Sequence, residues 1–130
     1  MNSAQVCNLA RLLSHTARQF PDRTALIQGE QHWTWAQIDQ RVDALVAALQ
    51  ALGVRQGDRL LQQSRNNLAM FESAWAAFRM GCVWVPTNFR LAPSEVAYLG
   101  AFLGRIVSWD ERSAVRLQAR GGVVDRKSVV

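Results

Sequence analysis

Apolar side chains recur every three or four residues in four segments of the chain, and this spacing predicts four amphipathic helices. The segments are residues 4–20, 34–52, 68–80 and 93–103. The expected buried faces are Val6, Leu9, Leu13, Ala17 and Phe20; Ile38, Val42, Leu45, Leu49 and Leu52; Phe71, Trp75 and Phe78; and Val96, Leu99 and Leu103. His15 falls off the first of these faces and is expected on the surface.

Residues at the helix ends support this assignment. Thr34 and Gln37 have the spacing of a capping box, in which each side chain accepts a hydrogen bond from a backbone N–H of the first turn. Asn66 or Asn67 can cap the third helix, and Gly81 can end it in the left-handed conformation. In the fourth helix, Pro93 is favourable in the first turn, and the negative charge of Glu95 interacts favourably with the helix dipole. Ala92, at the cap position, has no side-chain oxygen to accept a hydrogen bond.

Short apolar runs between these helices predict strands. They are residues 24–28 and 31–33, joined by a turn at Gly29 and Glu30, and residues 58–63, 82–85 and 105–109. Pro86 is expected to close its strand because it has no N–H to donate. A strand, a helix and a strand over 58–85 form a βαβ unit, which favours parallel pairing. From Asp110 onward no helical or strand period persists, so this tail is expected to be frayed or foreign to the fold.

These elements predict the α/β class, with a partial, mostly parallel sheet and flanking helices. The chain of 130 residues is long enough for one domain with a core. Its hydrophobic fraction of 49% and charged fraction of 19% are those of an ordinary globular protein.

Charge and cysteine content exclude several functions. The net charge is +5, but more than half of the excess lies in residues 105–130, and the body has no basic run, so we expect no nucleic-acid partner. No apolar run reaches the roughly 20 residues of a membrane span, and no secretory leader pattern is present, so a cytoplasmic location is expected. Cys7 and Cys82 lie too far apart for a CxxC motif and are expected to be buried thiols, bound neither to each other nor to zinc.

Ligands of open parallel sheets bind beyond the carboxyl ends of the strands, and two polar loops occupy that position here. They are residues 64–67 and 86–90. For the first loop, helix capping by its asparagines is the favoured alternative to ligand binding. For the second, organisation of a turn by Thr87, Asn88 and Arg90 is an equal alternative. The sequence has no glycine-rich phosphate loop and a single lysine, Lys127, so we assign no catalytic, cofactor-binding or metal-binding residue.

Three segments, in this order, resemble the N-terminal subdomain of the adenylate-forming superfamily, the acyl- and aryl-CoA synthetases. Residues 33–38 (WTWAQI) are similar to that family's (L/W)-T-Y-x-E-L, with Trp35 in place of Tyr and Gln37 in place of Glu. Residues 52–59 (LGVRQGDR) are similar to L-G-V-x-x-G-D-R, and residues 78–91 to x-R-x-G-x-V-x-V-P-x-N-x-R-L. The resemblance extends over roughly residues 8–107.

The resemblance implies a fold and an activity. It assigns residues 1–109 to part of the N-terminal subdomain and leaves 110–130 unmatched. An intact relative would use Mg²⁺ and ATP to convert a carboxylic acid to an acyl-adenylate, and coenzyme A would then displace AMP. The family's phosphate loop, adenine pocket and catalytic lysine have no counterpart here, so this fragment is expected to be inactive alone and to bind none of these cofactors. The alternative is a small non-enzymatic interaction module. In the fragment an unpaired sheet edge favours self-association, whereas the interaction module would use the sheet edge to bind its partner.

Overall fold

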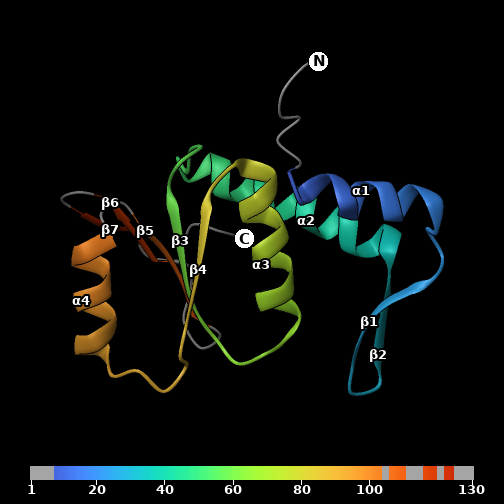
Figure 1. Ribbon diagram of the computed structural model, residues 1–130. Helices are drawn as coiled ribbons and strands as arrows, with labels where there is room; N and C mark the ends of the chain where they lie inside the picture. The colour runs from blue at the N-terminus through green and yellow to red at the C-terminus, as the bar shows by residue number, and fades with distance from the viewer. Residues whose placement is uncertain (1–7, 104–105, 111–115, 120–121, 125–130) are drawn as a thin grey trace, which may run out of the picture.

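The computed structural model describes residues 8–103, 106–110, 116–119 and 122–124, with side chains described up to residue 99 (Figure 1). The elements are α1 (Ala10–Gln19), β1 (Thr24–Gln28), β2 (Gln31–Thr34), α2 (Trp35–Ala51), β3 (Arg59–Gln63), α3 (Leu68–Met80), β4 (Val83–Thr87), α4 (Pro93–Leu103), β5 (Ile106–Asp110), β6 (Arg116–Ala119) and β7 (Gly122–Val124). None of the described helices is long and apolar enough to cross a bilayer.

The main sheet has the strand order β4-β3-β5-β6-β7, which confirms the predicted α/β class. β3 pairs in parallel with β4 and with β5, so the predicted βαβ unit is present. Figure 1 shows α3 and α4 on opposite sides of these parallel strands. The pairs β5–β6 and β6–β7 are antiparallel, so the predicted parallel arrangement is present in β4, β3 and β5 and does not extend to the rest of the described sheet.

The segment after Asp110 differs from its prediction, because it contributes the strands β6 and β7. These strands have four and three residues, too few for an alternating pattern to be visible in the sequence. They are recognised as strands by their hydrogen bonds to neighbouring strands and not by an alternation of apolar and polar residues. The assignment of 1–109 and 110–130 to separate units stays a prediction.

β4 is also longer than predicted, since it continues through Pro86 to Thr87. It is the terminal strand of the described sheet. The N–H of Val83 donates to the carbonyl of Asp58 on the β3 side (2.8 Å), so by alternation Pro86 turns its nitrogen outward. A proline at that position costs no ladder hydrogen bond. The strand was predicted to end at Pro86 because the sequence alone does not show that this strand lies at the edge of the sheet with the Pro86 nitrogen on its outer side.

α1 is shorter than predicted within the described residues. The side chain of Asn8 accepts a hydrogen bond from the N–H of Ala10 (2.9 Å), and the helix begins there. Leu13 and Ala17 are buried and His15 is exposed, as expected. Leu9 and Phe20 were predicted on the buried face but lie at the helix ends and are exposed. Val6 lies outside the described residues, as does Cys7.

The β1–β2 hairpin and α2 agree with the sequence. Thr34 and Gln37 form the predicted capping box. Ile38 and Val42 are fully buried in the core, and Leu49 is nearly so. They form one core with residues of α1, α3 and β3: Leu13, Leu60, Ala76, Ala77 and Met80.

α3 has the predicted ends but a different buried face. Asn67 caps it and Gly81 ends it with φ +67°. The buried positions are Glu72, Ser73, Ala76, Ala77 and Met80. The expected stripe of Phe71, Trp75 and Phe78 is only half-buried, and its rings meet edge to face with centroids 6.1 and 5.9 Å apart. Small side chains let α3 approach its neighbours closely, and this displaces the aromatic residues to its flank.

α4 has its predicted start, and Val96 and Leu99 are half-buried. The missing cap at Ala92 is compensated from within the helix, because the Glu95 carboxylate accepts a hydrogen bond from the N–H of Ala92 (2.7 Å). The side chain of Leu103 and residue Arg105 lie outside the described part.

Candidate functional site

The two polar loops predicted from the sequence lie together at the carboxyl ends of β3 and β4. Gln63 and Thr87, the last residues of these strands, are paired in register. The side-chain amide of Gln63 donates to the carbonyl of Leu91 (3.0 Å), which ties the end of β3 to the loop after β4. The expectation that both loops share one edge of the sheet is therefore confirmed.

Several polar side chains in these loops have structural roles. The side-chain oxygen of Asn67 accepts a hydrogen bond from the N–H of Met70 (2.9 Å) and caps α3, as the favoured alternative predicted. The Thr87 hydroxyl donates to the carbonyl of Gln62 (3.0 Å). The side-chain oxygen of Asn88 accepts from the N–H of Arg90 (3.0 Å) and shapes the turn.

This edge also carries an exposed cluster of one ring and two cations. The guanidinium carbons of Arg65 and Arg90 lie 5.3 and 5.2 Å from the centroid of the Phe89 ring. All three residues are exposed. Cation–π contacts of this kind hold the guanidinium groups near the ring while their N–H groups stay free to meet an anion. The cluster is the part of the predicted edge that has the chemistry to bind a ligand.

Beneath this edge lies a buried polar network that sequence analysis missed. Gln62 is 1% exposed, and its side-chain oxygen accepts hydrogen bonds from the Ser73 hydroxyl and from the Trp84 indole N–H (3.2 Å). Its amide nitrogen donates to the hydroxyl of buried Ser64 (3.4 Å). These bonds connect β3, α3 and β4 directly under the loops and compensate the burial of their polar groups.

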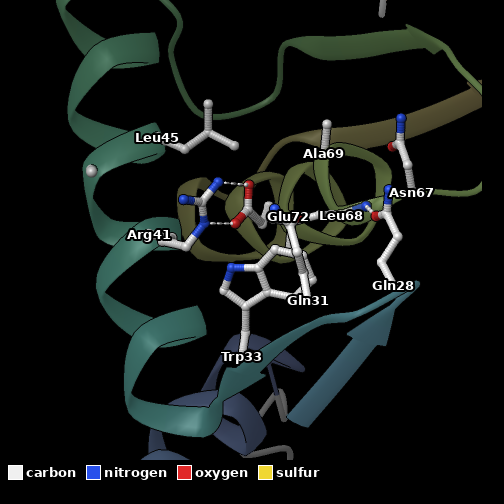
Figure 2. Close-up of a pocket in the computed structure, with 10 residues that line it drawn as sticks. Gln28, Gln31, Trp33, Arg41, Leu45, Asn67, Leu68, Ala69 and Glu72 are labelled. Atoms are coloured by element: carbon white, nitrogen blue, oxygen red, sulfur yellow. Dashed lines mark hydrogen bonds and ion pairs between the residues drawn. The ribbon is translucent and has the colours of Figure 1, made fainter.

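A cavity of about 470 Å³ lies between the β1–β2 hairpin, α2 and α3 (Figure 2). Arg41 of α2 and Glu72 of α3 meet in its lining through two hydrogen bonds, from Nε to Oε1 and from Nη2 to Oε2 (3.3 Å). The side chain of Glu72 is 9% exposed and that of Arg41 is 49% exposed. The hydrogen bond to Glu72 raises the pKa of Arg41 above its ordinary value, against the opposing effect of burial.

A second arginine joins three helices. The two Nη atoms of Arg79 on α3 donate to the carboxylates of Asp39 (2.6 Å) and Asp43 (2.5 Å) on α2. One of them also donates to the Ser14 hydroxyl on α1 (2.9 Å). Arg79 is the arginine of the third family-like segment, and its hydrogen bonds connect α3 to α1 and α2.

The second and third family-like segments contact one another. The N–H of Gly57 donates to the carbonyl of Gly81 (3.0 Å), and the side chain of Asp58 accepts from the N–H of Arg55 (2.8 Å). A Cβ on Gly81 would lie 3.0 Å from Cγ of Gln56, and its φ of +67° already disfavours other residues. The glycine and aspartate of these segments therefore build the turn that begins β3 and β4.

The described residues contain no group of three His, Cys, Asp or Glu side chains that could hold a metal ion. Cys82 is free and buried as predicted, and burial raises the pKa of its thiol above the ordinary value. This shift disfavours the thiolate, which is the reactive form of a cysteine. The loop edge and the cavity are two places in the described part of the chain where a ligand could be held.

The fold is that of an α/β domain in which the parallel strands β3 and β4 end at one polar edge. A family model described as "AMP-binding enzyme" matches residues 13–102, and the chain belongs to this family. A shorter match, to a domain of unknown function, covers residues 86–127.

Curated relatives include two kinds of ligase. The chain is 36% identical over 91 residues to a 2,3-dihydroxybenzoate-AMP ligase of Bacillus subtilis, a match that covers 70% of the chain and 17% of the relative. It is 38% identical over 91 residues to a feruloyl-CoA synthase of an Amycolatopsis species, covering 70% of the chain and 18% of that enzyme. The chain thus spans less than a fifth of the length of these relatives.

Solved structures have the same fold. The N-terminal subdomain of Klebsiella oxytoca NpsA aligns with a TM-score of 0.71 at 22% identity, over 88% of this chain and 29% of that one. A fatty acyl CoA synthetase of Mycobacterium tuberculosis aligns with a TM-score of 0.72 at 26% identity, over 78% of this chain and 21% of that one. The predicted fold of an N-terminal subdomain of an adenylate-forming enzyme is confirmed.

Proposed function

We propose that these residues are the N-terminal scaffold of an ATP-dependent acid–CoA ligase. The enzyme would convert a carboxylic acid, ATP and coenzyme A to an acyl-CoA, AMP and pyrophosphate. The observation that carries the proposal is the match to the AMP-binding enzyme family over residues 13–102, together with relatives that include a feruloyl-CoA synthase. The choice of a CoA thioester as product, and not an acyl-adenylate alone, is part of the proposal.

In such an enzyme the residues of this chain would support the active site and would not take part in the reaction themselves. Mg²⁺ and phosphate-binding groups supply the electrostatic stabilisation that adenylation needs. The sequence has no glycine-rich phosphate loop, so we assign no step of the reaction to these residues. Their contribution would be the rigid edge at the ends of β3 and β4, supported by the network around Gln62.

We further propose that the 130-residue chain does not catalyse adenylation by itself. The test is exchange of labelled pyrophosphate into ATP in the presence of Mg²⁺ and a panel of aryl and fatty acids. We expect no acid-dependent exchange above the protein-free rate, and exchange by the purified chain would contradict the proposal. A ligase of the same family is the positive control.

A chimera tests the scaffold role directly. The roughly 91 aligned residues of the Amycolatopsis feruloyl-CoA synthase would be replaced by those of this chain. We expect the chimera to keep acid-dependent pyrophosphate exchange, because 38% of the aligned residues are identical and both segments belong to one family. The matched control carries Gly81→Val in the same chimera and is expected to lose activity through strain at φ +67°. A folded chimera without exchange would instead favour the interaction-module alternative.

Self-association through the edge of β4 is also a proposal. Val83 is 52% exposed on this strand, which leaves an apolar edge open within the described sheet. Pro86 limits such pairing because it removes an outward N–H. We therefore expect Pro86→Val to increase the mass measured by light scattering at equal concentration, with Pro93→Ala as a control away from the edge. Unchanged mass in the Pro86 variant would exclude β4 as the contact.

We also infer a cytoplasmic location. The free, buried Cys82 is compatible with a reducing compartment. Fractionation of expressing cells is the test, and recovery of the chain with the membrane or secreted fraction would contradict the inference.

A further inference from the structure

The β1–β2 hairpin is fixed firmly at its base and weakly at its outer end. It forms a two-stranded sheet of its own, apart from the five-stranded sheet (Figure 1). At the base, the N–H of Trp35 donates to the carbonyl of Arg23 (3.0 Å). The N–H of Ala36 donates to the carbonyl of Pro21 (3.1 Å) in the same way. Residues 27–32, at the outer end, are all exposed. A two-stranded hairpin is stable only through what it packs against, so the contacts of this outer end decide its position.

Within the described residues, a single hydrogen bond joins the hairpin to α3. The side-chain oxygen of Gln28 accepts it from the N–H of Leu68 (2.8 Å), 40 residues further along the chain. Figure 2 shows Gln28 at the end of β1 beside Leu68 and Asn67. The N–H of Leu68 belongs to the first turn of α3 and has no acceptor inside the helix. Gln28 satisfies this donor from another element, so the bond connects the position of the hairpin to the start of α3 and to the preceding loop, residues 64–67.

Two cavities meet at this hydrogen bond. The cavity of about 470 Å³ described above and a second one of about 380 Å³ are both lined by Gln28 and Asn67. The first continues to Arg41 on α2, and the second continues to Trp84 on β4. Open space thus takes the place of packed side chains next to the bond. Because dispersion contacts depend on close packing, few of them oppose a displacement of the outer end of the hairpin.

The ladder of the hairpin is interrupted near its base. The pairs Thr24–Thr34 and Leu26–Trp33 leave Ala25 as an additional residue of β1, which is a β-bulge. A bulge interrupts the pairing and bends the strand at a defined residue. Leu26 and Trp33 are half-buried against the core. These two contacts limit the movement to a rotation about the bulge and prevent detachment of the hairpin.

We propose that residues 26–33 form a hinged arm, with the bulge at Ala25 as its hinge and the hydrogen bond from Leu68 to Gln28 as its latch. In the latched state the arm caps α3 and separates the two cavities. In the released state its outer end rotates away from α3, the N–H of Leu68 turns to water, and the two cavities join in one groove. The arm therefore couples the opening of this groove to loop 64–67, which leads into α3. The inference rests on the geometry of the hairpin and does not depend on the proposed function.

The position of the arm is measured with two spin labels on the full 130-residue chain. Glu30→Cys places one label on the exposed turn of the hairpin, and Gln50→Cys places the other at an exposed position of α2. Cys7→Ser removes a competing thiol, whereas Cys82 is buried and stays in place. Pulsed electron spin resonance then gives the distribution of distances between the labels. We expect one main distance, for the latched arm, and a minor population at another distance, for the released arm.

Amide hydrogen exchange of the chain without labels reports the latch directly. The N–H of Leu68 exchanges whenever the arm is released, whereas the N–H of buried Val42 on α2 requires a larger opening. We therefore expect Leu68 to exchange at least about ten-fold faster than Val42 after correction for intrinsic rates. Exchange of Leu68 only at the rate of Val42 would overturn the proposal, because the latch would then open only with the rest of the fold.

Three variants separate the latch from other roles of the hairpin. Gln28→Ala removes the acceptor, and we expect the released population to grow about five-fold, the effect of losing one hydrogen bond. Gln28→Glu keeps an oxygen for the N–H of Leu68, and its charge is favourable at the start of a helix, so the latched distance should persist. The matched control is Gln31→Ala, which makes the same change at the residue that faces Gln28 in the ladder. Its side chain has no hydrogen bond to the described residues, so we expect a released population within about two-fold of the wild type.

Each of these variants has an outcome that would overturn the proposal. Coinciding distance distributions of Gln28→Ala and the wild type would mean that packing alone holds the arm. An equal shift in Gln31→Ala would mean that the hairpin responds to any loss of a side chain at its outer end. The distribution of Gln28→Ala in Gln28→Glu would mean that the acceptor oxygen is not the latch. Finally, the cross-strand amides of residues 26–33 should stay protected in Gln28→Ala, since the arm rotates as a unit, and loss of their protection would indicate local unfolding instead.

Discussion

The interface between α2 and α3 contains two clusters of charge, and they have opposite polarity. In one, α2 supplies the cation Arg41 and α3 the anion Glu72. In the other, α3 supplies the cation Arg79 and α2 the anions Asp39 and Asp43. In each cluster the residue on α3 is the more buried one. Side-chain exposure is 9% for Glu72 and 17% for Arg79, against 49%, 26% and 67% for their partners on α2.

This difference follows from where the two helices lie. α3 lies between α2 and strands β3 and β4, whereas part of α2 faces water (Figure 1). A charge on α3 has therefore lost most of its hydration and depends on its partner, while a charge on α2 can return to water. The consequence is an asymmetry: loss of the partner on α2 should cost more than loss of the buried charge itself.

The largest effect is expected at Arg41. Arg41→Leu leaves the Glu72 carboxylate buried without its cation, and we expect a loss of about 3 kcal/mol in the free energy of unfolding. Glu72→Leu should cost clearly less, about 1 kcal/mol, because the freed guanidinium is already half-exposed. Urea unfolding followed by circular dichroism gives both values. Equal losses in the two variants would contradict the asymmetry.

The Arg79 cluster gives the same test with the charges reversed. The double variant Asp39→Ala/Asp43→Ala leaves Arg79 with only the Ser14 hydroxyl as a side-chain partner, and we expect a loss of about 2 kcal/mol. Arg79→Met keeps most of the aliphatic packing and leaves two carboxylates that water can reach, so about 1 kcal/mol is expected. Urea unfolding at low and high salt measures both, and a larger loss in Arg79→Met would reverse the order.

Sequence reasoning found the parts of the fold that are encoded locally. The capping box at Thr34 and Gln37, the Asn67 cap and the left-handed Gly81 each depend on residues within a few positions of one another. The βαβ unit was predicted from the spacing of apolar residues within each of its two strands and its helix. The order and spacing of the family-like segments then predicted the family, and the structure shows that the turns at Gly57 and Gly81, in two of these segments, contact each other.

The charged and polar core was not predictable in this way. Glu72 is 31 residues from Arg41 in sequence, and its burial depends on that partner. An amphipathic pattern therefore assigned the buried face of α3 to Phe71, Trp75 and Phe78, which are larger and more apolar. Gln62 could have been suspected, since it lies on the same face of β3 as the buried Leu60, but its partner Ser73 lies on another element. Of the candidate site, sequence placed the two loops on one edge but gave no sign of the cavity.

The smallest effect is expected at Asp43, the most exposed member of either cluster. Asp43→Asn removes its charge but leaves an amide oxygen for Arg79, which also keeps Asp39. We expect a change within about 0.5 kcal/mol, the usual contribution of a solvent-exposed ion pair. Asp39→Asn, at 26% exposure, should cost more in the same urea titration. An equal or larger loss in Asp43→Asn would mean that exposure on α2 does not decide how strongly these charges contribute, and the contrast between the two helices would then need another cause.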